Sequence, residues 1–290
     1  MALTLKSTVA VPFTNFAIPI LGLGVFRNDN CKPACLAALA HGYRHIDSAR
    51  MYRNEKQVGE AVRESGVPRE DIFITSKIYQ LEGGYQGALS QIDDSLKNFG
   101  FGPPYDRALT ERRRADYIDL YLIHSPIGGK ENRVETWKAL LDAKKAGKLR
   151  GVGVSNYGPK HIDEIREAGL DLPSVNQVEL HPFCQQKEIV DYCNKSGILV
   201  EAYCPLVRGS FGDPVLQALC KKYNKDPAQI LVRWSLQRGF VPLPKSAKPE
   251  RVRSNADLYD FEISEEDLAK LNSLDRGKAG AISWNPVDTE

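Results

Sequence analysis

The stretch YRHIDSARMYRNEKQVGEAV, residues 43–62, decides the predicted fold because it joins a strand to a helix. Its first five residues are typical of the end of a buried strand. Residues 54–65 then carry apolar side chains at helical spacing, at Val58, Ala61 and Val62. Asp47 ends the strand, and Tyr52 follows five residues later. A strand that leaves a hydrophobic interior therefore delivers a carboxylate and a phenol close together.

The same alternation of strand and helix runs along the whole chain. Short β-branched runs lie at 19–26, 43–47, 71–77, 116–124, 150–155, 175–180, 197–205 and 240–246, and helical patterns lie at 54–65, 87–99, 134–148, 159–169, 185–197 and 226–239. Several runs are almost continuously apolar, as parallel strands buried on both faces are. Eight repeats in 290 residues predict an α/β protein, a single (β/α)8 TIM barrel over residues 1–290 with a short N-terminal hairpin and a short C-terminal tail. An open, doubly wound sheet is the alternative architecture.

One segment departs from this regular pattern. Residues 101–115, FGPPYDRALTERRRA, form an insertion between a helix and the fourth strand, where connections are usually short. The insertion contains the basic run Arg112 to Arg114. It is either a solvated surface excursion or a basic contact surface for an acidic partner.

Composition excludes several classes of protein. Apolar and charged fractions of 42% and 26% are ordinary for a globular chain, and a net charge of +2 gives no field that would attract nucleic acid or a membrane. The six cysteines form no CxxC pair or zinc spacing, so we expect reduced thiols and no metal site. No signal peptide or apolar run of about 20 residues is present. We expect a cytoplasmic protein, monomeric or weakly oligomeric, that acts on a small molecule.

The predicted strands carry polar side chains to one end of the barrel, where active sites of this fold lie. Any one of these residues has a structural explanation, such as a helix cap, a solvated strand end or a hydrogen-bonded core histidine. Three successive strands, however, contribute an ionisable group at the same face. The candidate residues are Asp47, Tyr52, Lys77, His124, Ser155, Asn156, Gln177, Tyr203, Lys245 and Ser246.

These residue types favour acid–base chemistry on oxygen. A free tyrosine has a pKa of about 10, and a nearby ammonium such as that of Lys77 would lower it. Asp47 could hold and balance the ammonium, while His124 could orient the other reactant. Such a phenol would exchange a proton with a carbonyl or alcohol oxygen. Proton transfer alone would suit an isomerase, whereas reduction needs a hydride donor.

The other strand ends indicate where a hydride donor could bind. The chain has no GxGxxG fingerprint, so a Rossmann fold is disfavoured. Instead PKSAKPERVRSN, residues 244–255, follows the last strand with Lys245, Ser246 and Arg251. This segment is either a phosphate site or a charged helix cap. Tyr203 could stack on a flat ring, and Ser155, Asn156 and Gln177 could bind a carboxamide.

Taken together, these motifs resemble the aldo-keto reductase family. The matching stretches are GLGVF, YRHIDSARMYRNE, DIFITSK, DYIDLYLIHSP, RGVGVSNY, NQVELHP, AYCPL and PKSAKPERVRSN, in the family's order from about residue 19 to 275. The resemblance implies a (β/α)8 barrel that binds an extended nicotinamide cofactor and reduces aldehydes and some ketones. Tyr52 then resembles the proton donor, tuned by Lys77 and Asp47, and His124 resembles the residue that orients the carbonyl.

The resemblance also implies a set of cofactor ligands. Ser155, Asn156 and Gln177 resemble the carboxamide ligands and Tyr203 the stacking platform. Lys245, Ser246 and Arg251 resemble ligands of the 2′-phosphate, which implies NADPH. The remaining implied cofactor contacts are Val25, Phe26, Asp47, Cys204, Pro205, Leu206, Pro244 and Asn255.

Departures from the family pattern concern the substrate. Positions 26, 79 and 125 carry Phe26, Tyr79 and Ser125, where the family often has tryptophan, so the implied pocket is Phe26, Tyr79, His124, Ser125 and Trp284. Ser254 stands where many NADP-dependent members have glutamate. The alternative function is a cofactor-binding regulatory subunit of the same fold with little turnover, like the potassium-channel β-subunits.

Overall fold

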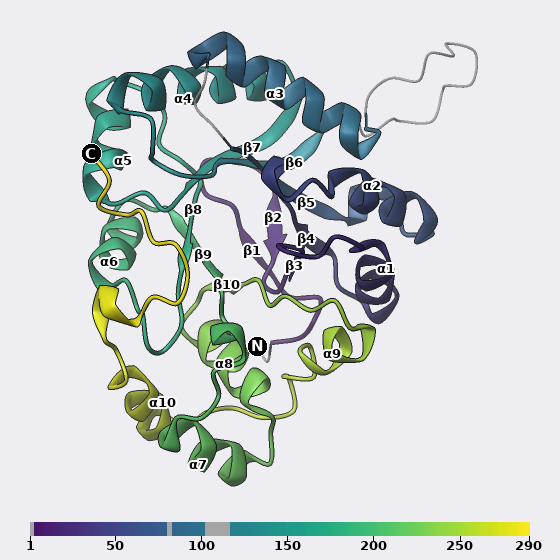
Figure 1. The fold of residues 1–290 in the computed structure, drawn as a ribbon, viewed down its shortest axis with the longest axis vertical. Coiled ribbons are helices and arrows are strands. Elements are labelled where there is room, and N and C mark those ends of the chain that lie inside the picture. The colour runs from purple at the N-terminus through teal and green to yellow at the C-terminus, as the bar shows by residue number, and fades with distance from the viewer. Residues whose placement is uncertain (1–2, 80–82, 102–116) are drawn as a thin grey trace.

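The computed structural model describes residues 3–79, 83–101 and 117–290, and it shows a parallel barrel (Figure 1). Eight strands pair in chain order, and they are β3 Leu23–Gly24, β4 His45–Asp47, β5 Phe73–Ile78, β6 Ile118–Ile123, β7 Leu149–Ser155, β8 Val175–Glu179, β9 Leu199–Tyr203 and β10 Val241–Pro242. The amides of Gly22 and Gly24 donate to the carbonyls of Pro242 and Pro244, both at 3.1 Å, which joins the first strand to the last. The predicted α/β barrel fold is confirmed.

Helices surround the barrel. They are α1 Lys32–His41, α2 Glu55–Glu64, α3 Gly84–Phe99, α4 Lys130–Lys145, α5 Pro159–Glu167, α6 Lys187–Lys195, α7 Pro214–Tyr223, α8 Pro227–Gln237, α9 Pro249–Ser254 and α10 Glu265–Asn272. Helices α1, α7 and α10 were not among the helical patterns. The starts of α7 and α10 could have been predicted from their capping residues. Asp213 accepts hydrogen bonds from the amides of Val215 and Leu216 at the start of α7, and Ser264 accepts one from the amide of Asp267 at the start of α10.

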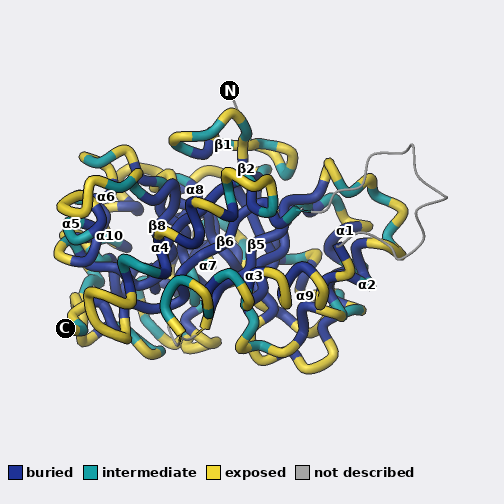
Figure 2. Tube along the Cα trace, turned by 90° about the horizontal axis from the view of Figure 1, so that it is seen from above, coloured by how far each residue is buried: buried dark blue, intermediate teal, exposed yellow. Residues whose placement is uncertain are grey.

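The first predicted strand, residues 19–26, was too long. Pro19 instead belongs to a hairpin formed by β1 Thr8–Ala10 and β2 Ala17–Pro19, and the barrel strand β3 is confined to two residues. Figure 2 shows this hairpin at one end of the barrel. Its buried Val11 and Ile18 belong to the same apolar cluster as Phe73, Leu120 and Val241 of the barrel. The hairpin therefore covers the amino-terminal ends of the strands, and the opposite end is left for a site.

Two features bear on the remaining expectations from the sequence. Among the described residues, no helix is long and apolar enough to cross a membrane. All six cysteines are free thiols, and four of them are buried. The predicted insertion at 101–115 lies outside the described residues except for Phe101, whose ring stacks on Phe99 at 5.1 Å.

Candidate active site

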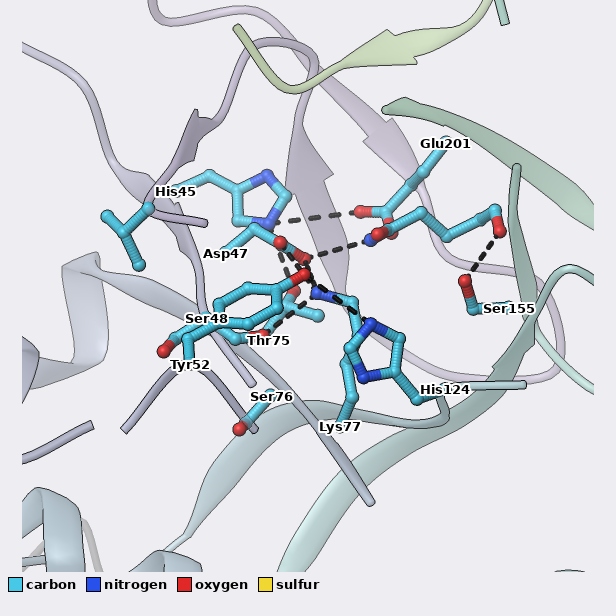
Figure 3. A network of polar contacts seen from close by, with 12 residues as sticks. His45, Asp47, Ser48, Tyr52, Thr75, Ser76, Lys77, His124, Ser155 and Glu201 are labelled. Carbon is cyan, nitrogen blue, oxygen red and sulfur yellow. Dashed lines mark hydrogen bonds and ion pairs between the residues drawn. The ribbon is translucent and has the colours of Figure 1, made fainter. Parts of the chain in front are cut away.

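Four ionisable side chains meet at the carboxyl ends of three adjacent strands. Asp47 ends β4, Lys77 lies near the end of β5, and His124 directly follows β6. Tyr52 ends the short 3-10 helix η1, Arg50–Tyr52, which follows β4. Figure 3 shows these side chains pointing toward one another. The structure therefore brings together the four side chains that the sequence analysis singled out.

Lys77 is fully buried, and all three of its ammonium hydrogens have an acceptor. The Nζ atom lies 2.6 and 2.7 Å from the two carboxylate oxygens of Asp47 and 2.8 Å from the carbonyl oxygen of Ser48. It also lies 5.3 Å from the centroid of the Tyr52 ring. Asp47 thus holds the ammonium and balances its charge, as expected from the residue types.

The expected effect of Lys77 on Tyr52 is not observed. The buried surroundings of the hydroxyl, followed by the negative charge of Asp47, raise the pKa of Tyr52 well above its ordinary value. The prediction of a lowered pKa was wrong for this arrangement, because it counted the ammonium and neglected both desolvation and the carboxylate that neutralises it. At neutral pH the phenol of Tyr52 is therefore protonated and can act as a proton donor.

His124 is the partner of this phenol. Its Nε2 atom lies 3.5 Å from the hydroxyl oxygen of Tyr52, and the two rings meet edge to face at 5.6 Å. Burial, followed by the charge of Lys77, lowers the pKa of His124 well below its ordinary value. The imidazole is therefore neutral at physiological pH. A neutral imidazole beside a protonated phenol can bind an uncharged oxygen such as that of a carbonyl.

A second polar group extends from this cluster over the ends of β7, β8 and β9. The hydroxyl of Ser155 donates to the main-chain carbonyl oxygen of Gln177 at 2.8 Å, and the side-chain amide nitrogen of Asn156 lies 3.1 Å from Ser155 Oγ. The hydroxyl of Tyr203 lies 2.8 Å from Asn156 Oδ1. The Gln177 side chain reaches back to the first cluster, with Nε2 donating to Asp47 at 2.8 Å. The two polar clusters are thus connected.

The other implied cofactor residues lie at the same end of the barrel. Val25 donates its amide to the carbonyl of Asp47, and Pro244 accepts from Gly24 at the seam that closes the sheet. Lys245 and Arg251 are exposed, while Ser246 and Asn255 are buried. The segment 204–209 contains Cys204, Val207 and Arg208 with left-handed backbone at φ of 52°, 42° and 51°. Non-glycine residues held in that region often mark a functional loop.

Residues of the implied substrate pocket divide into an exposed and a buried group. Phe26, Tyr79 and Trp284 are 38%, 41% and 49% exposed, whereas His124 and Ser125 are buried. The Phe26 ring lies 5.0 Å from the Tyr52 ring, and the Tyr79 ring lies 6.5 Å from His124. Phe26 and Tyr79 therefore flank the phenol and the imidazole. The Trp284 carbonyl lies 2.9 Å from the hydroxyl of Tyr203, which places the tail beside the polar clusters.

Sequence reasoning missed two buried polar residues of this region. Glu201 in β9 lies 2.9 Å, through Oε2, from Gln177 Nε2, and His45 in β4 lies 3.8 Å from Glu201 Oε1. Both could have been found from strand alternation, because positions two apart point to the same side. His45 precedes Asp47 by two residues, and Glu201 precedes Tyr203 by two.

These residues fit a nicotinamide cofactor. A carboxamide needs both hydrogen-bond donors and acceptors. The Ser155 hydroxyl lies 3.1 Å from Asn156 Nδ2 and 2.8 Å from the main-chain carbonyl oxygen of Gln177, and Gln177 adds a side-chain amide. Exposed cations at Lys245 and Arg251 suit a phosphate.

Comparison with known proteins agrees with this arrangement. Residues 22–276 match the model of the Aldo/keto reductase family. The chain is 49% identical over 262 residues to an uncharacterized oxidoreductase of Schizosaccharomyces pombe, covering 88% of each chain. It is 43% identical over 280 residues to the glyoxal reductase of Bacillus subtilis, covering 95% of each. The structure of a Bombyx mori aldo-keto reductase in complex with NADP matches with a TM-score of 0.83 at 33% identity, covering 95% of this chain and 94% of that one.

The fold and the polar clusters at the carboxyl ends of its strands are those of a barrel oxidoreductase. This chain belongs to the Aldo/keto reductase family. The resemblance noted in the sequence is confirmed.

Proposed function

We propose that the protein is an NADPH-dependent reductase that converts aldehydes and some ketones to alcohols, with Tyr52 as the general acid. The observation that carries this proposal is the contact of Tyr52 with His124 above a buried, fully paired Lys77. The relatives in the family support carbonyl reduction in general. The tyrosine mechanism, the NADPH preference and the substrate range are proposed for this chain.

In this mechanism each side chain has one task. His124 and Tyr52 both bind the carbonyl oxygen, since their polar atoms point toward one another at a distance of 3.5 Å (Figure 3). A reduced nicotinamide, when bound beside them, would supply the hydride for the carbonyl carbon. Tyr52 donates its hydroxyl proton to the oxygen as negative charge develops there. The ammonium of Lys77 then stabilises the phenolate until the proton is replaced.

The cofactor would lie across the ends of the later strands. Ser155, Asn156 and Gln177 would bind the carboxamide and Tyr203 would stack on the ring. Lys245, Ser246 and Arg251 would bind the 2′-phosphate, which favours NADPH over NADH. Phe26, Tyr79 and Trp284 would line an open pocket around the carbonyl, and Ser125 in place of a larger side chain would leave room beside His124.

The test is NADPH consumption with an aromatic aldehyde and with glyoxal. Replacing Tyr52 with phenylalanine should lower kcat/KM by about 100-fold or more, the contribution typical of a general acid, while NADPH binding measured by fluorescence is retained. Tyr85→Phe is a matched control, because its hydroxyl bonds Asp142 on the surface between α3 and α4.

Equal rates for wild type and Tyr52→Phe would remove the phenol from the mechanism. NADPH binding without turnover of any carbonyl in the wild type would instead favour the regulatory-subunit alternative.

A further inference from the structure

The side-chain amide of Gln177 is shared by two buried carboxyl groups. Its Nε2 atom lies 2.8 Å from Asp47 Oδ2 and 2.9 Å from Glu201 Oε2. An amide nitrogen carries two hydrogens, so these contacts use both. The carbonyl oxygen of this amide is then the atom left to face a ligand.

Glu201 has no cation of its own. It is fully buried, and its Oε1 atom has no hydrogen-bond partner among the described residues. His45 lies 3.8 Å away but is neutral, because burial and then Lys77 lower its pKa to about 3. Lys77 is already paired with both oxygens of Asp47. The ammonium of Lys77 is therefore paired with Asp47, and Glu201 lies in the same interior without an ion-pair partner of its own among the residues that the structure describes.

The groups around Glu201 come from each strand packed against it. β4 contributes His45 and Asp47, β5 contributes Lys77, and β8 contributes Gln177. On the other side, β10 places the apolar Val241 opposite Glu201. Ionisation of Glu201 thus gives this interior a net negative charge, and a positively charged ligand group nearby would compensate that charge.

We propose that Glu201 is a positioning residue that acts through Gln177, fixing the amide so that its oxygen faces the carboxamide pocket and favouring the oxidised, positively charged nicotinamide over the reduced, neutral one. This inference rests on the proposed function, because it takes Gln177 as a cofactor ligand. Burial, followed by the charge of Asp47, raises the pKa of Glu201 to about 8. Its charge therefore changes within an accessible range of pH.

The proposal predicts that the charge of the bound nicotinamide ring changes the proton affinity of Glu201. A cationic ring lowers the pKa of a nearby carboxyl, so NADP+ should displace part of a proton from Glu201, whereas NADPH should not. The 2′-phosphate is common to both cofactors and cancels in the comparison.

The experiment measures the dissociation constants of NADP+ and NADPH by calorimetry at about pH 6.5 and about pH 9, together with proton release in weak buffer. In the wild type, the ratio of the NADP+ constant to the NADPH constant should fall by roughly threefold or more as pH rises. In Glu201→Gln and Glu201→Met the ratio should be independent of pH and the excess proton release lost.

Two further variants act as controls. Glu55→Gln replaces another buried glutamate, which bonds Ser76 and Asn98 outside the site, and should keep the wild-type pattern. Tyr52→Phe should also keep the excess proton release, which separates Glu201 from the phenol as the source of the proton.

The outcomes are distinguishable. Binding of both cofactors at a pH-independent ratio in the wild type, or an unchanged pH dependence in both Glu201 variants, would overturn this inference and leave the reductase proposal standing. Failure of either cofactor to bind would count against the proposed function itself.

Discussion

At the scale of single residues, Lys77 connects the acid–base pair to the carboxylates. Its ammonium is saturated by Asp47 and the Ser48 carbonyl, so the phenol of Tyr52 lies beside a neutral ion pair and not beside a free cation. Together with the burial of the hydroxyl, which is the larger cause of its raised pKa, this explains why Tyr52 retains its proton at neutral pH. The pair supplies stabilisation only once negative charge appears on the phenol or the substrate oxygen.

Replacing Lys77 with methionine should abolish measurable reduction and leave NADPH binding detectable by fluorescence. The substitution leaves Asp47 as a buried carboxylate without its cation, so the free energy of unfolding should fall by about 3–5 kcal/mol. Chemical denaturation measures the second effect. Adding Asp47→Asn should recover part of that stability without recovering activity; recovery of turnover would contradict the assigned role of Lys77.

The NADPH preference depends on a few exposed cations. Arg251→Ala should weaken NADPH binding by roughly tenfold, about the 1.4 kcal/mol of one charge-assisted hydrogen bond, and leave NADH binding nearly unchanged. Titration with both cofactors measures this. Arg253→Ala is the matched control, since it removes another exposed cation from the same helix α9, Pro249–Ser254. Equal losses for NADPH and NADH in Arg251→Ala would remove the 2′-phosphate assignment.

At the scale of elements, the barrel interior changes character along its strands. Near the amino-terminal ends, Phe73, Leu120 and Val175 pack under the β1–β2 hairpin. Near the carboxyl ends, the strands carry Asp47, Lys77 and Gln177. The hairpin therefore completes an apolar core at one end of the barrel interior, and the candidate site lies toward the other end.

Helix packing gives a test at this scale. In most exposed helices, Gly→Ala stabilises by up to about 1 kcal/mol. At Gly59 of α2, however, an added Cβ would lie 1.9 Å from the carbonyl oxygen of Phe99 in α3. We expect Gly59→Ala to destabilise the protein by roughly 1–3 kcal/mol in urea denaturation, because backbone must move. Gly212→Ala is the control, because no atom of the described residues lies within 4 Å of its added Cβ. If Gly59→Ala stabilised the protein instead, α2 and α3 would have to move apart at little cost in free energy.

At the scale of the whole molecule, the buried Glu201 should shape stability against pH. Its pKa is raised to about 8 from an ordinary value of 4.5, so the folded state binds its proton more tightly than the unfolded state. The associated stability is complete below about pH 4.5 and is lost as pH rises through about 8. Between pH 6.5 and 9 the unfolding free energy of the wild type should therefore fall relative to that of Glu201→Gln. Denaturation of both proteins at each pH measures this difference. A constant difference would mean that Glu201 does not titrate in this range.

Much of the architecture could be predicted because it depends on local patterns. Eight apolar runs of strand length are interspersed with six helical patterns, and Gly147 and Gly197 after α4 and α6 take the left-handed backbone expected of helix ends. The short strand β3 and the helix α1 were harder. β3 is defined by pairing with Asp47 and Lys245 across the seam, and α1 is apolar on most of its surface, so neither shows a clear period.

The sequence by itself determined the alternation of parallel strands and helices and which end of each strand carries chemistry, because both follow from periodicity and chain order. Closure into a barrel is seen in the contacts of Gly22 and Gly24 with Pro242 and Pro244. Only the tertiary structure decided how the charges combine. Strands far apart in the chain bring Asp47, Lys77, Gln177 and Glu201 into one desolvated interior, where a pKa depends on all neighbours at once. That is why Tyr52 holds its proton more tightly than its nearest cation suggested, and why Glu201 was missed.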